Sequence, residues 1–199
     1  LPPKSHEVAI RNTAIGLNFI DTYHRSGLYP VELPSYLGLE GAAVVTDLGK
    51  AVDGFNLGDR VAYVGLPIGA YAEQRNYPAS GLVKIPESIP NELAAASLLK
   101  GLTAWYLINK SYPIKIGDDV LVYAAAGGVG LFLCQWAEHL GARVIGVVST
   151  SEKAELAQLN GCTEIIYADD KQLVKKTREL TNGKGVAAVY DSVGKDTFY

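Results

Sequence analysis

The chain has 199 residues, of which 48% are hydrophobic and 20% are charged, and its formal net charge at pH 7 is -3. That balance is typical of a globular protein with enough apolar side chains for one large core or two small ones. The mildly acidic charge and the scattered Lys and Arg residues argue against nucleic acid as a partner, and no run approaches the roughly 20 apolar residues of a membrane span.

The cysteines and the chain ends give further expectations. Cys134 and Cys162 match no spacing of a metal-binding or redox motif, so we interpret both as reduced packing residues of a cytoplasmic protein. The N-terminal residues do not form a signal peptide. The sequence contains no methionine and stops just after a predicted strand, which suggests a segment of a longer protein.

The first half of the chain predicts short strands separated by turn residues. Val8 and Ile10 alternate with charged neighbours, and residues 41–46 form a run of small and β-branched side chains. Further strands are predicted at 60–64 and 70–75. Short strands with Gly and Pro between them indicate a compact β barrel or sandwich.

From Asn91 the hydrophobic pattern changes to that of a helix. The predicted helix runs from Glu92 to Ile108, behind Pro90 and with Asn91 as its N-cap. The change of period at this helix places a domain boundary there, with a first domain over residues 1–97 and a second over residues 98–199.

Beyond this boundary, strands and helices alternate, which predicts an α/β fold with a parallel, doubly wound sheet. Gly141 and Gly161 are placed to end two of the helices, and Ser149 with Glu152 predicts a capping box. The predicted strands are 119–125, 142–148, 164–168 and 186–191. Four strands are fewer than the six that are usual in such a domain, which again suggests a segment.

A glycine-rich loop joins the first strand of this half to the helix that follows, and its sequence is Ala125-Ala126-Gly127-Gly128-Val129-Gly130. Between a strand and a helix, this is the setting of a dinucleotide-binding loop. Gly127 lets the backbone approach a pyrophosphate, Gly130 lets helix and strand pack closely, and the helix N-terminus offers N–H groups to the anion. Ala125 replaces the first glycine of the usual pattern. The alternative is a tight connection that binds no ligand.

The residues after the second strand of this half discriminate between NADH and NADPH. An NAD site needs a carboxylate there to bind the ribose 2′-hydroxyl. This chain has Ser149-Thr150-Ser151, followed after Glu152 by Lys153. Hydroxyls and a lysine suit a 2′-phosphate, which a carboxylate would repel, so we predict NADPH. Lys153 also fits a solvated lysine in the first turn of a helix.

With these features established, the chain resembles the NADPH:quinone oxidoreductase (zeta-crystallin-like) family, in the zinc-free branch of the medium-chain dehydrogenase/reductase superfamily. The resemblance covers nearly the whole chain and depends on segments besides the glycine loop, namely 18–23, 25–30, 58–61, 100–103, Gln135 and 191–194. It implies a GroES-like β-rich domain followed by a Rossmann domain, both partial, with the active site in the cleft between them. It also implies a homodimer for the full-length protein.

The resemblance further implies roles for individual residues. Those that would line the active site near nicotinamide and substrate are Asn18, Asp21, Tyr23 and Tyr29. Those that would bind the cofactor are Thr103, Ala126, Gly127, Gly128, Val129, Gly130, Ser149, Thr150, Lys153, Tyr167 and Ser192. On the residues alone, aromatic packing explains the two active-site tyrosines, and a hydrogen bond to backbone in a turn explains the aspartate.

The resemblance also bears on zinc, because the zinc-dependent relatives supply Cys and His ligands from the β domain. This chain has Leu39 where their histidine would be, and Asn18 and Lys100 where their cysteines would be. Zinc needs a set of nitrogen and sulfur donors, which the three scattered histidines do not provide. We therefore expect no metal and a structural role for Glu40.

These expectations combine into a predicted function, the NADPH-dependent reduction of quinones or similar electron-poor conjugated carbonyls. The cofactor carries the chemistry, and the protein orients the nicotinamide and excludes water. Tyr23, Tyr29 and Asn18 are available to polarise the acceptor's oxygen. One alternative is a reductase for the C=C bond of an enal, enone or enoyl thioester, which the same scaffold serves. Another is a nucleotide-binding protein without catalysis.

Overall fold

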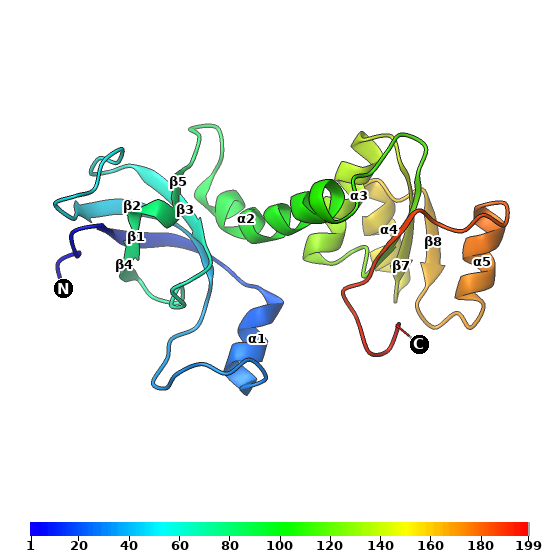
Figure 1. Ribbon diagram of the computed structural model, residues 1–199, viewed down its shortest axis with the longest axis horizontal. Helices are drawn as coiled ribbons and strands as arrows, with labels where there is room; N and C mark the ends of the chain where they lie inside the picture. Colours follow the sequence, from blue (N-terminus) through cyan, green and yellow to red (C-terminus); the bar gives the residue numbers. More distant parts are fainter. Residues whose placement is uncertain (199) are drawn as a thin grey trace. The chain divides into compact units, whose positions relative to one another are not determined.

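The structure is a computed structural model that describes residues 1–198 (Figure 1). Its internal contacts divide the chain into two compact units, one up to Leu99 and the other from Lys100 onward. The helix α2 (Asn91–Tyr106) runs across this division, and a π-helical turn, Leu107–Ser111, continues it.

The first unit is built on a five-stranded antiparallel sheet in the order β4-β1-β2-β3-β5 (Figure 1). Helix α1 (Phe19–Ser26) follows the first strand, and a 3-10 turn, Ala79–Gly81, precedes the last. The strands are β1 (Glu7–Gly16), β2 (Glu40–Leu48), β3 (Arg60–Val64), β4 (Gln74–Pro78) and β5 (Leu82–Lys84).

Alternation along the strands sends apolar side chains to two different buried clusters. One cluster contains large side chains, among them Val8, Ile10, Val45, Tyr63 and Tyr77. The other contains Ala42 and Ala62, which lie opposite each other in β2 and β3, and Ala95 of α2. Small residues on this face allow a close approach, since a Cβ at Gly16 would lie 2.2 Å from the Ala95 carbonyl oxygen.

The second unit is a parallel sheet in the order β8-β7-β6-β9, and the predicted doubly wound arrangement is confirmed. Helices α3 (Gly128–His139) and α4 (Ser151–Leu159) contribute to one core, with valines of β6 and β7. Helix α5 (Leu173–Leu180) packs with the alternate strand residues in a second core. The strands are β6 (Asp119–Tyr123), β7 (Arg143–Val148), β8 (Glu164–Tyr167) and β9 (Ala188–Tyr190).

Three predictions of where elements begin are wrong. Asn91 is the first residue of α2 rather than its N-cap, and its side chain bonds to Arg60 and Thr13. The strand expected at 70–75 lies at Gln74–Pro78, because the residues before it form hydrogen bonds with the 37–38 segment instead of a sheet ladder. The cap of α4 is Thr150 rather than Ser149, since the Thr150 hydroxyl accepts a hydrogen bond from the first turn of the helix. The shift of one residue leaves the Ser149 hydroxyl outside the helix.

We predict that Gly130→Val lowers the free energy of unfolding by about 3 kcal/mol, at the upper end of the usual cost of overpacking. A Cβ at Gly130 would lie 2.3 Å from the Ala124 carbonyl oxygen and 2.7 Å from that of Ala125, and backbone atoms of a strand end cannot move aside. Chemical denaturation of the intact protein measures the loss.

Gly101→Ala in α2 is the matched control for this substitution. A Cβ at Gly101 would meet no atom within 4 Å, so alanine should stabilise the helix by up to about 1 kcal/mol. Equal effects of the two substitutions would contradict the close approach of α3 to the strand end.

Candidate functional site

The glycine loop leaves β6 in a tight backbone turn. Ala124 has φ 49°, in the left-handed region, and its carbonyl accepts the Gly127 N–H at 2.8 Å. The left-handed position therefore lies one residue before Ala125, which is fully buried. Gly127 precedes α3 in an extended conformation, and no side chain within the described residues caps that helix. The N–H groups of its first turn are thus placed to receive an anion.

The other predicted cofactor residues of the second unit lie at the carboxyl ends of neighbouring strands. Since β6, β7 and β8 pair in parallel register, the glycine loop shares one edge of the sheet with Ser149, Thr150 and Tyr167. Ser192 follows β9, which pairs with β6 on its other side. Open parallel sheets bind ligands at this edge. We refer to it below as the carboxyl edge.

After β7, polar groups gather around the start of α4. Lys153 Nζ donates to Ser149 Oγ at 2.9 Å, and both side chains are exposed. Hydrogen bonding from its own backbone N–H and from the Thr150 side chain lowers the pKa of Glu152. The Glu152 carboxylate is therefore favoured at the start of its own helix, while the lysine and the Ser149 hydroxyl contact each other.

Helix α2 adds two residues to the second unit. Thr103, a predicted cofactor residue, is half-buried. Lys100 lies with its aliphatic chain against the glycine loop, since a Cβ at Gly128 would lie 2.8 Å from Lys100 Cδ and 2.9 Å from its Cε. A cationic side chain beside a loop favours an anionic ligand there. The residue type alone gave no signal for this position, because a lysine in a helix is usually solvated.

In the first unit, a buried carboxylate holds Asn18. Glu40, the first residue of β2, is completely buried. Its Oε2 accepts a hydrogen bond from Asn18 Nδ2 at 2.7 Å, and its Oε1 accepts one from the Leu99 N–H at 2.7 Å. A Cβ at Gly16 would lie 2.3 Å from Oε2, so glycine leaves the carboxylate its space. Because Nδ2 faces Glu40, the amide oxygen of Asn18 is directed away from that carboxylate.

Asp21 is buried at the start of α1, with 3% of its surface exposed. Its Oδ2 accepts the Asn18 backbone N–H at 2.9 Å and the Tyr71 hydroxyl at 2.7 Å. Burial, together with the hydrogen bond to Asp21 and its charge, raises the pKa of Tyr71 to about 12. Asp21 Oδ1 is buried without a hydrogen-bond partner in the described part of the chain. Asp21 thus fixes the start of the helix and a tyrosine 50 residues away.

Tyr23 and Tyr29 form an aromatic pair, with ring centroids 5.2 Å apart. The Tyr29 N–H also donates to the Tyr23 carbonyl at 3.2 Å. Tyr29 is 48% exposed, and the His24 ring lies 6.2 Å from it. The structure therefore brings the four predicted active-site residues together at α1 and the turn after it, and adds Glu40 and Tyr71 to them. No local sequence pattern indicates Tyr71, because its link to Asp21 is made by the fold.

In residues 1–198 there is no group of three or more His, Cys, Asp or Glu side chains that could hold a metal ion. Glu40 accepts hydrogen bonds from an amide nitrogen and a backbone N–H, neither of which is a zinc ligand. No helix in the same residues has the length and apolar character to cross a bilayer.

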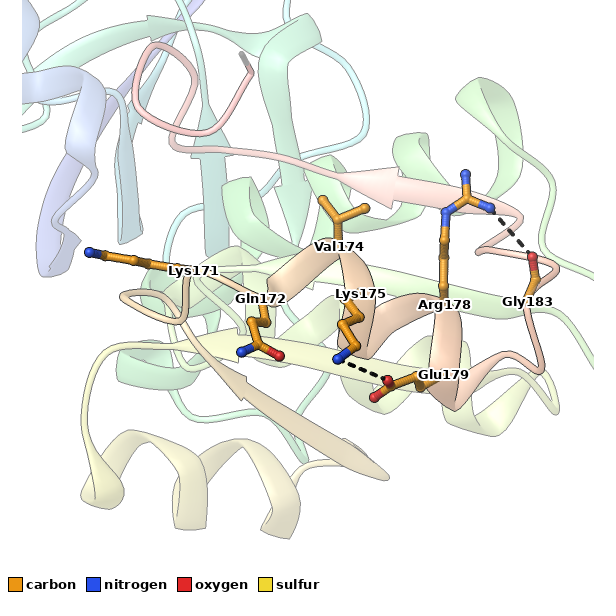
Figure 2. Close-up of a pocket in the computed structure, with 7 residues that line it drawn as sticks. All are labelled: Lys171, Gln172, Val174, Lys175, Arg178, Glu179 and Gly183. Atoms are coloured by element: carbon orange, nitrogen blue, oxygen red, sulfur yellow. Dashed lines mark hydrogen bonds and ion pairs between the residues drawn. The ribbon is translucent and has the colours of Figure 1, made fainter.

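Two surface hollows of the second unit have none of the predicted cofactor residues in their lining. Figure 2 shows one on α5, where Lys175 and Glu179 form an ion pair of 3.8 Å at its border. Another lies over β6, β9 and α5, with Tyr123 and Asp191 in its lining. No residue of the glycine loop or of α1 lines either hollow.

Comparisons with known proteins agree with this architecture. A model of the alcohol dehydrogenase GroES-like domain matches residues 4–87, and a model described as zinc-binding dehydrogenase matches residues 128–199. A quinone oxidoreductase of Pseudomonas aeruginosa is 52% identical over 98% of this chain and 61% of its own length. Quinone oxidoreductase 1 of Escherichia coli is 49% identical over 98% of this chain and 60% of its own.

A solved structure gives the same result. The quinone oxidoreductase of Escherichia coli, complexed with NADPH, superposes with a TM-score of 0.96 at 48% identity, over 99% of this chain and 61% of the other. Over nearly its whole length, this chain is therefore similar to quinone oxidoreductases of the medium-chain dehydrogenase/reductase superfamily. The predicted family and the predicted GroES-like and Rossmann folds are confirmed. The chain spans about 60% of the length of the curated relatives it matches.

We predict that Glu40→Ala lowers the free energy of unfolding by about 3 kcal/mol. The substitution removes the carboxylate that accepts hydrogen bonds from Asn18 Nδ2 and the Leu99 N–H, and loss of a buried hydrogen-bond partner costs roughly 1–3 kcal/mol. Glu40→Gln is the matched control, because it keeps the shape and one carbonyl acceptor and should lose less. Urea denaturation of the intact protein compares them, and an unchanged midpoint for Glu40→Ala would refute the role of the carboxylate.

Proposed function

We propose that the intact protein is an NADPH-dependent oxidoreductase that reduces quinones without zinc. The observation that carries this proposal is the carboxyl edge, where a glycine loop lies beside Ser149 and Lys153, with no carboxylate immediately after β7. The named activities of the relatives, and the NADPH in the Escherichia coli structure, support the same cofactor and acceptor class. The absence of Cys and His at the positions of Asn18, Leu39 and Lys100 supports a reaction without zinc.

In this proposal each group of residues at the carboxyl edge binds one part of NADPH. The first turn of α3, from Gly127 to Gly130, receives the pyrophosphate, and Ala126 leads the backbone into it. Ser149 and Lys153 bind the 2′-phosphate, with Thr150 and Tyr167 beside them. Ser192 and Thr103 contact the nicotinamide half. NADPH, when bound, supplies the reducing electrons.

The residues of α1 and the turn after it are proposed to bind the acceptor. A quinone is flat and neutral, so the exposed ring of Tyr29 offers it a stacking surface and the hydroxyl of Tyr23 or Tyr29 a donor to its oxygen. Asn18 offers an amide whose orientation Glu40 fixes. Asp21 acts as a positioning residue, because its contacts are to Asn18 and Tyr71. The reduced oxygen takes its proton from solvent.

We predict that Lys153→Ala weakens NADPH binding about tenfold and leaves NADH binding unchanged. A charge-assisted hydrogen bond to the 2′-phosphate is worth at least about 1.5 kcal/mol, and NADH has no such phosphate. Fluorescence titration of the intact protein with both nucleotides measures the two affinities. Lys175→Ala on α5, an exposed lysine in a 3.8 Å ion pair, is the control. Equal loss for both nucleotides would contradict the assignment.

The proposed activity is tested by following NADPH oxidation by the intact protein with a panel of quinones. We expect turnover with benzoquinones and naphthoquinones, and slower turnover with NADH in place of NADPH. No turnover with any quinone, in a preparation that binds NADPH, would reject the quinone reductase and favour a nucleotide-binding protein without catalysis.

A second candidate is reduction of an activated C=C bond. A relative named 2-haloacrylate reductase, from a Burkholderia species, is 48% identical over 98% of this chain and 60% of its own length. Conjugated acids, enones and quinones all accept electrons from the same reduced cofactor, and the fold does not separate them. Comparing rates on an enone, a haloacrylate and a quinone distinguishes the two functions.

We also propose that the intact protein is a homodimer and that it is cytoplasmic. The two free thiols fit a cytoplasmic location, where cysteines stay reduced.

A further inference from the structure

Two cysteines meet inside the second unit, behind the glycine loop. Cys134 lies on α3 and Cys162 in the short turn between α4 and β8, 28 residues further along the chain. Their Sγ atoms are 3.3 Å apart, and the residues are 0% and 5% exposed. Both are free thiols. Because 28 residues separate them, the sequence does not predict this contact. Packing alone does not require two sulfur atoms to touch.

Close backbone approaches hold the two thiols together. Gly161, with φ 98°, leaves no room for a side chain, since a Cβ there would lie 2.8 Å from the Cys134 carbonyl oxygen. On β7, a Cβ at Gly146 would lie 2.6 Å from Cys162 Sγ. Glycines at both positions therefore let the turn that carries Cys162 rest directly against α3 and β7, with no side chain between the sulfur atoms.

We propose that Cys134 and Cys162 form a redox-active dithiol, which closes to an intramolecular disulfide when the protein meets a peroxide. A disulfide bond is about 2.05 Å long, so each sulfur needs to move by well under 1 Å from the present contact. Side-chain rotation can supply a movement of that size. The linked ring would join α3, which begins at the glycine loop, to the start of β8.

The two thiols form a hydrogen bond in which either sulfur can be the donor. Cys134 Sγ also lies 3.8 Å from the Ala125 carbonyl oxygen, which can accept its S–H. Either cysteine can therefore act as the nucleophile, with the other as the resolving thiol.

The reaction balances with one peroxide. With Cys162 as the nucleophile, its thiolate attacks an oxygen of hydrogen peroxide, the O–O bond breaks, and the released hydroxide takes a proton to give water and a Cys162 sulfenic acid. The sulfur of Cys134 then attacks the sulfenic sulfur. The S–O bond breaks, and the leaving hydroxide takes the Cys134 proton to give a second water. Two thiols are oxidised to a disulfide and one peroxide is reduced to two waters.

The test exposes the intact, folded protein to hydrogen peroxide, removes the oxidant, and alkylates the remaining thiols in denaturant. Mass spectrometry of peptides is expected to find Cys134 and Cys162 linked, with the loss of two hydrogens and of both alkylation sites, and dithiothreitol is expected to restore both thiols. Cys134→Ser and Cys162→Ser are matched variants that each keep one thiol and are expected to give no internal link.

A thermal readout separates the disulfide from simple thiol damage. Closing the loop between the two cysteines should raise the unfolding temperature of the second unit by roughly 5 °C or more, and reduction should remove the increase. Neither serine variant should show it. Full alkylation of both thiols after peroxide, links only between molecules, or a link that forms only in denaturant would each overturn the proposal. None of these results depends on nucleotide binding or on quinone turnover.

Discussion

The second unit depends on how closely α3 approaches the backbone that ends β6. A Cβ at Gly130 would lie 2.3 Å from the Ala124 carbonyl oxygen, so the helix can start beside the strand end only because this residue has no side chain. That approach sets the direction of the first-turn N–H groups, and the left-handed Ala124 supplies the turn that precedes them. The parallel register then fixes where Ser149 and Tyr167 lie relative to the loop. The proposed nucleotide site therefore follows from the close approach at Gly130 and from the parallel register of the sheet.

The first unit meets a comparable constraint with a buried charge. A carboxylate removed from water needs partners for its oxygen atoms, and Glu40 has an amide N–H on one oxygen and a backbone N–H on the other. The Asn18 amide and the Leu99 N–H donate to this carboxylate. These donors are not zinc ligands, which supports the proposal that the reaction needs no zinc.

Most of the fold could be predicted from the sequence because each element carries a local signal. The apolar strands of the second half, the glycine that ends α3 and the glycine loop all depend on neighbours within a few residues. The contacts between distant residues could not be predicted in that way. Tyr71 bonds to Asp21 across 50 residues, and Cys134 touches Cys162 across 28. Lys100 lies beside Gly128 because of how α2 packs. The cap of α4 is Thr150, one residue after the predicted Ser149.

The NADPH proposal depends on the Glu152 carboxylate as well as on the Lys153 ammonium group. Glu152 would repel a 2′-phosphate if its carboxylate faced the ligand, and it lies next to Lys153 in the chain. Hydrogen bonding from its own backbone N–H and from Thr150 lowers its pKa, so the charged form is favoured at the start of α4. The helix dipole also favours an anion at that end. Lys153 contacts Ser149, and the lysine and hydroxyl together offer donors to a phosphate.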